Sequence, residues 1–86
     1  MKVRVSSHIR SYTGGKAEVE ADGATLAAVL SDLDRRYPGL RFRLVDEQER
    51  LRPHINVFVG DALTRDLARP LGPAEEISIF AALSGG

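Results

Sequence analysis

Few residues of this 86-residue chain have the types and spacing that catalytic or metal chemistry requires. His8 and His54 are the only histidines, and neither has carboxylates at a spacing typical of metal ligands, so we expect no metal site. Gly14-Gly15-Lys16 lacks the Gly-x-x-x-x-Gly-Lys-Ser/Thr spacing of a phosphate-binding loop, and the paired glycines predict a hairpin turn instead. Asp32 and Asp34 lie about 200° apart on a predicted helix, which excludes an acid–base pair. We therefore expect a protein that is not itself an enzyme.

The remaining candidate for chemistry is the final stretch, Leu83-Ser84-Gly85-Gly86, which follows a predicted strand. Glycine has no Cβ, so two glycines in succession fit a narrow tunnel that side chains would block. With Gly86 as the last residue, as we expect, a free carboxylate stands at the end of that tail. The alternative interpretation is an ordinary frayed terminus. The elements that precede the tail must distinguish the two.

Composition limits the classes of protein to which the chain can belong. Its length predicts one domain with a single core. It has no cysteine, which excludes disulfides and thiol nucleophiles, and neither a secretory signal nor a membrane span is visible, so we expect a cytoplasmic protein. Twelve basic residues balance twelve acidic ones, and they are scattered. Nucleic-acid binding usually requires a basic stripe or excess, so we expect no nucleic-acid partner. Because no apolar stretch is long enough to span a bilayer, we expect no membrane partner.

The first half of the chain predicts a hairpin followed by a helix. Residues 2–6 and 17–21 alternate apolar and polar side chains and predict two antiparallel strands, with Arg4 opposite a glutamate. An apolar stripe at helical spacing over residues 26–37 predicts an amphipathic helix. Thr25 is its expected N-cap, and Pro38-Gly39 ends it.

The second half predicts three more strands. These cover residues 40–45, 54–59 and 75–81, with a charged loop over 46–52 and an irregular connector over 63–72. The order β-β-α-β-β-β predicts an α+β protein whose sheet packs on one helix. One helix covers one sheet face, and the alternation places Phe58 and Phe80 on the other. Exposed apolar residues are common, but two on strands that could be neighbours favour a partner-docking patch.

These elements and four local motifs together resemble the ubiquitin-like sulfur-carrier proteins of the MoaD/ThiS type. The motifs are Tyr12-Thr13-Gly14-Gly15, Asp22-Gly23-Ala24-Thr25-Leu26, His54-Ile55-Asn56-Val57-Phe58-Val59 and Gly85-Gly86. The resemblance implies a β-grasp fold: a mixed sheet of four to five strands on one main helix, with the first and last strands parallel at its centre. It also implies a single domain over residues 1–86 with a flexible tail over 82–86.

The resemblance assigns the chemistry to the tail. The Gly86 carboxylate would be adenylated by a ubiquitin-activating-like adenylyltransferase using ATP and then converted to a thiocarboxylate, while Gly85 lets the tail thread into the partner. Phe58, Phe80, Leu83 and Ser84 would bind the partner proteins. No cofactor would be held permanently, and catalysis would belong to the partners. The carrier would then count at most as the small subunit of a sulfurtransferase.

Several sulfur acceptors remain open. We favour a molybdopterin-type carrier, whose acceptor would be the large subunit of molybdopterin synthase, while cysteine, tRNA and thiamine sulfuration are the alternatives. Thiamine-type carriers tend to be shorter, and Ala81-Ala82 stand where many members carry prolines. Two other functions use the same features differently: a protein modifier joined to lysine through Gly86, and a β-grasp interaction module whose tail is inert.

Overall fold

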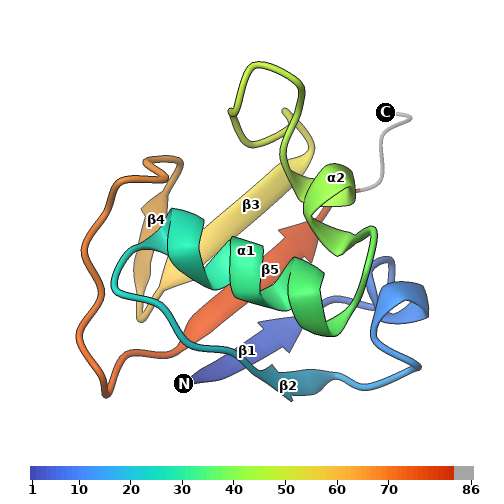
Figure 1. Ribbon diagram of the computed structural model, residues 1–86, viewed down its shortest axis with the longest axis horizontal. Helices are drawn as coiled ribbons and strands as arrows, with labels where there is room; N and C mark the ends of the chain where they lie inside the picture. Colours follow the sequence, from blue (N-terminus) through green and yellow to red (C-terminus); the bar gives the residue numbers. More distant parts are fainter. Residues whose placement is uncertain (83–86) are drawn as a thin grey trace.

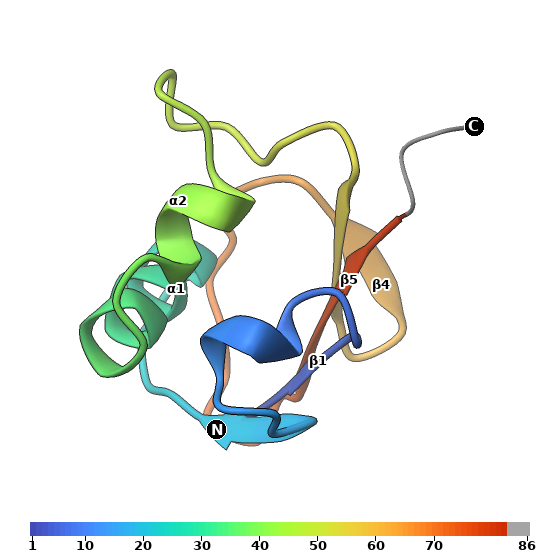
Figure 2. The ribbon, with the colours of Figure 1, turned by 90° about the vertical axis from the view of Figure 1, so that its right-hand side faces the viewer.

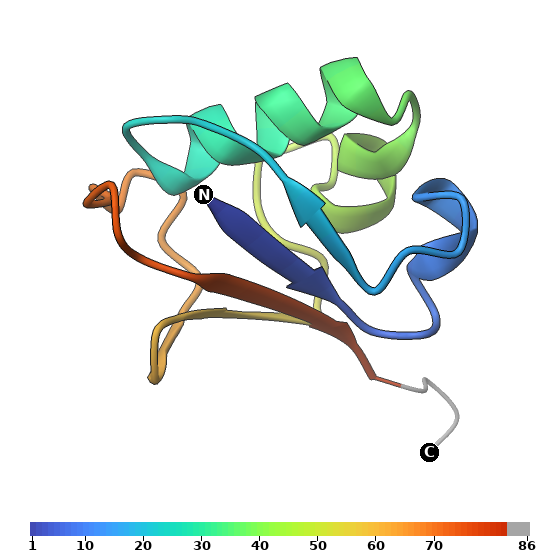
Figure 3. The ribbon, with the colours of Figure 1, turned by 90° about the horizontal axis from the view of Figure 1, so that it is seen from below.

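The computed structural model describes residues 1–82, in which a five-stranded mixed sheet carries two α-helices on one face (Figures 1, 2 and 3). The strand order across the sheet is β2-β1-β5-β3-β4. β1 and β5 are parallel at the centre, as the resemblance implied, and the other three pairs are antiparallel. The elements are β1 (Lys2–Val5), a 3₁₀ turn (Arg10–Tyr12), β2 (Glu18–Glu20), α1 (Leu26–Arg36), α2 (Leu40–Leu44), β3 (Ile55–Val59), β4 (Ala62–Thr64) and β5 (Ile77–Ala81).

The predicted hairpin is confirmed. β1 and β2 pair in antiparallel register, with Arg4 opposite Glu18, and the Arg4 Nε atom lies 3.4 Å from Glu18 Oε1. Gly14 and Gly15 both have positive φ, 67° and 87°, in the connection between the strands. The paired glycines therefore serve the turn, because only residues without a Cβ reach this backbone region readily.

The core lies between the sheet and the helices. Alternate residues of the central strands point inward and are fully buried, among them Val3, Ile77 and Ile79. They pack against the predicted apolar stripe of α1, in which four residues are buried: Leu26, Val29, Leu30 and Leu33. The apolar faces that arise from a period of two along the strands and of about 3.6 along the helix thus pack against each other. This is why local sequence patterns identified these elements.

The N-terminus of α1 is capped by residues near and far in sequence. Thr25 is the N-cap, and its Oγ1 accepts a hydrogen bond from the Ala28 N–H at 3.2 Å. The N–H groups of Leu26 and Ala27 have no acceptor within the helix. They donate instead to the carbonyls of Arg69 and Leu67, at 3.0 and 2.8 Å. The connector before β5 therefore completes the helix, a role that its irregular sequence did not reveal.

Residues 40–45 do not form the predicted third strand; residues Leu40–Leu44 form α2. Asp34 supplies the reason, since its Oδ1 accepts hydrogen bonds from the N–H groups of Gly39 and Arg41, both at 3.1 Å, and so caps the new helix. Leu40 and Leu44, one turn apart, are both fully buried. The alternation of apolar and charged residues fits a strand equally well, but a helix buries the two leucines together.

The connector predicted over residues 63–72 begins with a strand that the sequence did not reveal. β4 continues from a turn at Gly60 (φ 59°) and pairs with β3 at the sheet edge. Three residues are too few for a period to be recognised. The observed order is therefore β-β-α-α-β-β-β, and the predicted α+β class, with a mixed sheet on one main helix, is confirmed. Neither helix in residues 1–82 is long and apolar enough to cross a membrane.

Candidate functional site

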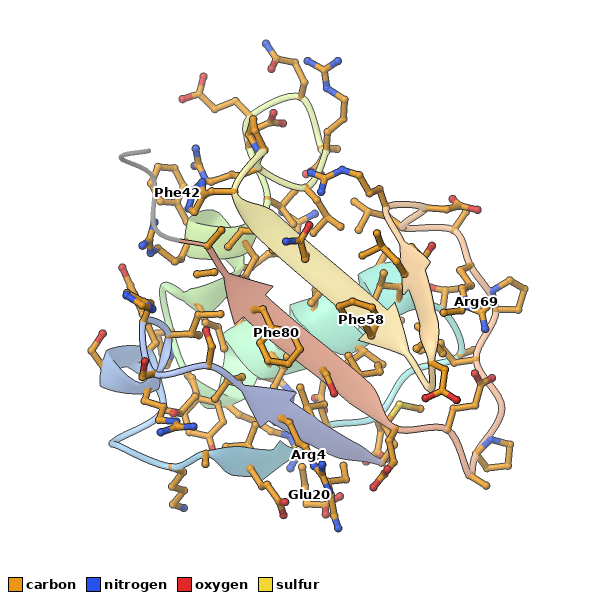
Figure 4. The ribbon with its side chains drawn as sticks, turned by 180° about the vertical axis from the view of Figure 1, so that it is seen from behind. Arg4, Glu20, Phe42, Phe58, Arg69 and Phe80 are labelled. Carbon is orange, nitrogen blue, oxygen red and sulfur yellow. The ribbon has the colours of Figure 1, made fainter. Side chains whose placement is uncertain are left out.

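The face of the sheet that the helices leave open carries the two predicted phenylalanines (Figure 4). Phe58 on β3 and Phe80 on β5 lie on neighbouring strands, and their ring centroids are 5.9 Å apart at an interplanar angle of 83°. Edge-to-face pairs of this kind contribute about 0.5–1.5 kcal/mol beyond the area that they bury. Phe80 is nevertheless 46% exposed. The predicted proximity of these two side chains is confirmed.

Leu63 extends this apolar area and was not predicted. It lies opposite Phe58 in the β3–β4 ladder, and opposed residues of a ladder project to the same face of a sheet. Its side chain is 58% exposed. We refer to Phe58, Leu63 and Phe80 as the sheet patch. A recognisable strand at residues 62–64 would have been the only sequence signal for Leu63.

Charged side chains border the sheet patch on the side of β1 and β2. Lys2 Nζ lies 3.9 Å from carboxylate oxygens of both Glu18 and Glu76, and Arg4 pairs with Glu18. Exposed ion pairs add little to stability. An apolar centre with a charged rim is, however, the arrangement found in protein–protein interfaces.

The sheet patch leads directly to the base of the tail, because Phe80 is followed by Ala81 and Ala82. The Ala81 N–H donates to Ser6 Oγ at 3.1 Å, and the Ala82 N–H donates to the His54 carbonyl at 2.8 Å. Ala82, the first residue of the predicted tail, follows β5 and is bonded to the His54 carbonyl through its N–H. The predicted site residues Leu83, Ser84, Gly85 and Gly86 lie outside the described residues.

Arg65 fixes the segment that holds Ala82. Its Nη1 donates to the Ile55 carbonyl at 2.7 Å, and its Nη2 donates to the carbonyls of Leu51 and Arg52, both at 2.8 Å. His54, whose carbonyl accepts the Ala82 N–H, lies inside this segment. A single arginine in an irregular connector gives no sequence signal for such a role, so sequence reasoning missed it.

The acidic residues of α1 have structural partners. Asp32 accepts hydrogen bonds from the Asp22 N–H at 2.9 Å and from Arg35 and Arg36. The Asp22 N–H, and after it the Arg35 guanidinium, hold the pKa of the Asp32 carboxyl below its usual value. Asp34 caps α2. Within residues 1–82, no three side chains of the metal-ligating types come together.

Comparison with protein families settles the family. The model of the ThiS family matches residues 3–86, nearly the whole chain. The chain belongs to the ThiS family. The resemblance found in the sequence is therefore confirmed.

Relatives of this ThiS-family protein are small carriers and modifiers. It is 35% identical to the sulfur carrier protein CysO of Mycobacterium tuberculosis over 89 residues, which cover 98% of this chain and 96% of the relative. It is 34% identical to the small archaeal modifier protein 3 of Haloferax volcanii over 68 residues, covering 76% and 73% of the two chains. The structure superposes with a TM-score of 0.90 on a chain of the Amycolatopsis orientalis BexX/CysO complex, at 34% identity and with 99% and 98% of the two chains covered.

Proposed function

We propose that this ThiS-family protein is a sulfur carrier that works through its C-terminal Gly86. The supporting observation is its similarity, over 98% of its length, to a protein named as a sulfur carrier. The exposed sheet patch and the hydrogen-bonded Ala82 agree with this function, since the patch would serve as a docking surface and Ala82 as a fixed starting point for the tail.

The proposed chemistry has two steps. The Gly86 carboxylate is a poor electrophile, so one of its oxygens first attacks the α-phosphorus of ATP on a ubiquitin-activating-like adenylyltransferase, and pyrophosphate leaves. Hydrosulfide or an enzyme persulfide then attacks the carbonyl carbon of the acyl adenylate, and AMP leaves. When the donor is hydrosulfide, the product is the thiocarboxylate directly. A persulfide donor gives an acyl disulfide with the enzyme instead; a second thiol then attacks the enzyme's sulfur, which releases the thiocarboxylate and leaves a disulfide between that thiol and the enzyme. The carrier supplies recognition and the acyl group.

Intact-mass measurement tests this proposal directly. The protein is incubated with ATP, sulfide and the activating enzyme encoded in the same genome, and we expect a mass gain equal to the difference between sulfur and oxygen. A variant that lacks Gly86 is the control and should not gain mass. An unchanged wild-type mass, with an enzyme that activates another carrier in the same assay, would refute the proposal.

The sulfur acceptor requires a separate experiment. The molybdopterin-type acceptor favoured by the sequence stays a prediction, and the relatives described above do not favour it over cysteine, tRNA or thiamine sulfuration. The purified thiocarboxylate is mixed in turn with the large subunit of molybdopterin synthase and with a cysteine-forming enzyme. The partner that returns the carrier to its original mass is the acceptor.

A second function is favoured by one observation, the similarity to a small archaeal modifier protein. In this case the activated Gly86 carbonyl would be attacked by a lysine Nζ on a target protein, which gives an isopeptide bond. Heavier conjugates should then be detected in cell lysates and should disappear when Gly86 is deleted.

A further inference from the structure

A second exposed surface lies at the same end of the sheet as the base of the tail (Figures 1 and 4). It belongs to α2, the 3₁₀ turn and the segment before β3, and Glu47 borders the same hollow. We refer to the following residues as the tail-base surface: Tyr12, Phe42, Arg43, Arg52 and His54. One hydrogen bond connects it to the base of the tail, since the His54 carbonyl accepts the Ala82 N–H at 2.8 Å, and within the surface Arg43 Nη1 lies 3.1 Å from His54 Nε2.

Phe42 is exposed and held in place. It is 68% exposed, more than any other large hydrophobic side chain in residues 1–82. The Arg52 guanidinium carbon lies 4.9 Å from the centre of its ring, and Arg52 Nε donates to the Phe42 carbonyl at 2.8 Å. Nothing in the core requires an aromatic residue here, because α2 buries Leu40 and Leu44 instead. An aromatic ring that is already ordered loses little freedom on binding, which is favourable for an interface anchor.

The two arginines of this surface form no ion pair with an acidic side chain in residues 1–82. Five other arginines form ion pairs with acidic side chains, whereas no ion pair within residues 1–82 involves Arg43 or Arg52. His54 offers Arg43 a ring nitrogen as acceptor, since a guanidinium can only donate. Among residues 1–82, Glu47 is the only acidic residue that lines the hollow. Two arginines against one glutamate give this hollow an excess of positive charge, which complements carboxylates. Phe42 also lines a second hollow, with Asp34, Asp46 and Glu49, so the positive charge lies on the Arg43 and Arg52 side of the ring.

The length of the tail limits the distance between Ala82 and an active site that acts on Gly86. From Ala82, the four residues 83–86 reach at most about 13–14 Å, at ~3.3–3.6 Å per residue. An enzyme that acts on the Gly86 carboxylate therefore has to approach the base of the tail closely. The sheet patch begins at Phe80, two residues before Ala82, and the tail-base surface is joined to Ala82 through His54.

We propose that the tail-base surface docks onto an acidic rim, with an apolar recess for Phe42, around the active-site entrance of the activating enzyme. This inference rests on the proposed function and adds to it a second contact, on the helix side of the tail, that is electrostatic where the sheet patch is apolar. Such charge pairs chiefly raise the rate and specificity of association.

Two variants and a matched control test the inference in the ATP–pyrophosphate exchange reaction of the activating enzyme. Arg52→Glu and Phe42→Ala should each raise the KM for the carrier by about tenfold and leave kcat within about twofold, because the surface contacts the partner and not the reacting carboxylate. Arg50→Glu makes the same charge change two residues away, where the arginine side chain donates one exposed hydrogen bond, to Gln48. Its KM should stay within about twofold of wild type. The wild-type KM should also rise with ionic strength, and less steeply in Arg52→Glu.

The possible outcomes separate this inference from the proposed function. Wild-type exchange with an unchanged KM in both variants would overturn the inference and leave the carrier function standing. An equal rise in KM in Arg50→Glu would also overturn it, since the effect would then depend on the total charge of the protein and not on this surface. No exchange by the wild type would overturn both. If circular dichroism shows that Arg52→Glu is misfolded, the KM of Phe42→Ala and the salt dependence of the wild type test the inference instead. Phe42→Ala should fold, because Phe42 contributes no buried side chain.

Discussion

Replacing Arg65 by alanine should loosen the base of the tail more than the rest of the fold. The Arg65 guanidinium donates to two carbonyls in the segment between α2 and β3 and to the carbonyl of Ile55, the first residue of β3. That segment contains the His54 carbonyl to which Ala82 is bonded. Without the guanidinium, these carbonyls lose a shared donor and the segment is free to move. The effect should therefore appear first at the Ala82 amide.

The expected loss of stability in Arg65→Ala depends on which of the three hydrogen bonds are sheltered from water. The bonds to Leu51 and Ile55 are partly buried, whereas the bond to the Arg52 carbonyl is exposed and water can replace it. The Arg52 carbonyl also accepts the Ile55 N–H at 2.9 Å, so it keeps a partner. Two sheltered bonds at about 0.5–1.5 kcal/mol each give about 1–3 kcal/mol. A loss of about 2 kcal/mol lowers the Tm of a domain of this size by about 8–16 °C.

Urea unfolding and amide exchange measure the two parts of this prediction. Arg65→Ala should lower the free energy of unfolding by about 2 kcal/mol without changing the slope with urea. Relative to wild type, the exchange rate of the Ala82 amide should rise more than the exchange rates of amides in the central strands. Arg65→Lys should recover only part of the loss, because an ammonium does not reproduce the fork of a guanidinium.

Arg50→Ala is the matched control, since its side chain makes one exposed hydrogen bond, to Gln48. It should change stability by less than about 0.5 kcal/mol. The reasoning would be refuted if Arg65→Ala behaved like Arg50→Ala, or if Arg65→Lys were as stable as wild type.

Three further predictions concern the sheet patch and the acidic residues of α1. Phe80→Glu should raise the KM for the carrier in adenylation and should cost at least about 0.5–1.5 kcal/mol of stability through the lost ring pair, as kinetics and urea unfolding would show. Asp34→Ala should cost about 1 kcal/mol in urea unfolding and Asp34→Asn less, because the amide oxygen can still cap α2. The pKa of Asp32 is lowered in the folded state, so its carboxylate stabilises the fold above the unfolded pKa, and this contribution is lost as the pH falls through the folded value. Asp32→Asn should therefore be less stable than wild type at neutral pH, and urea unfolding at successively lower pH should show the difference shrinking.

The sequence predicted the parts of the site that depend on local periodicity. Strand alternation at β3 and β5 placed Phe58 and Phe80 on one face. Because only one helix was predicted, and one helix covers one face of a sheet, that face was expected to be open. Their proximity then required only that the two strands be neighbours. Leu63 escaped prediction because a three-residue strand has no readable period. The tail residues Leu83, Ser84, Gly85 and Gly86 stay a prediction, supported by membership of the ThiS family.

The sequence by itself determined the hairpin, the main helix, the two long strands and the apolar face of the sheet, since each follows from the spacing of residues close together in the chain. Tertiary structure alone decided that residues 40–44 form a helix, because their pattern fits both states and the Asp34 cap selects one. It also decided the role of Arg65, whose three acceptors lie 10 to 14 positions away. Side-chain hydrogen bonds over such separations leave no periodic signal, and here they set the point from which the tail departs.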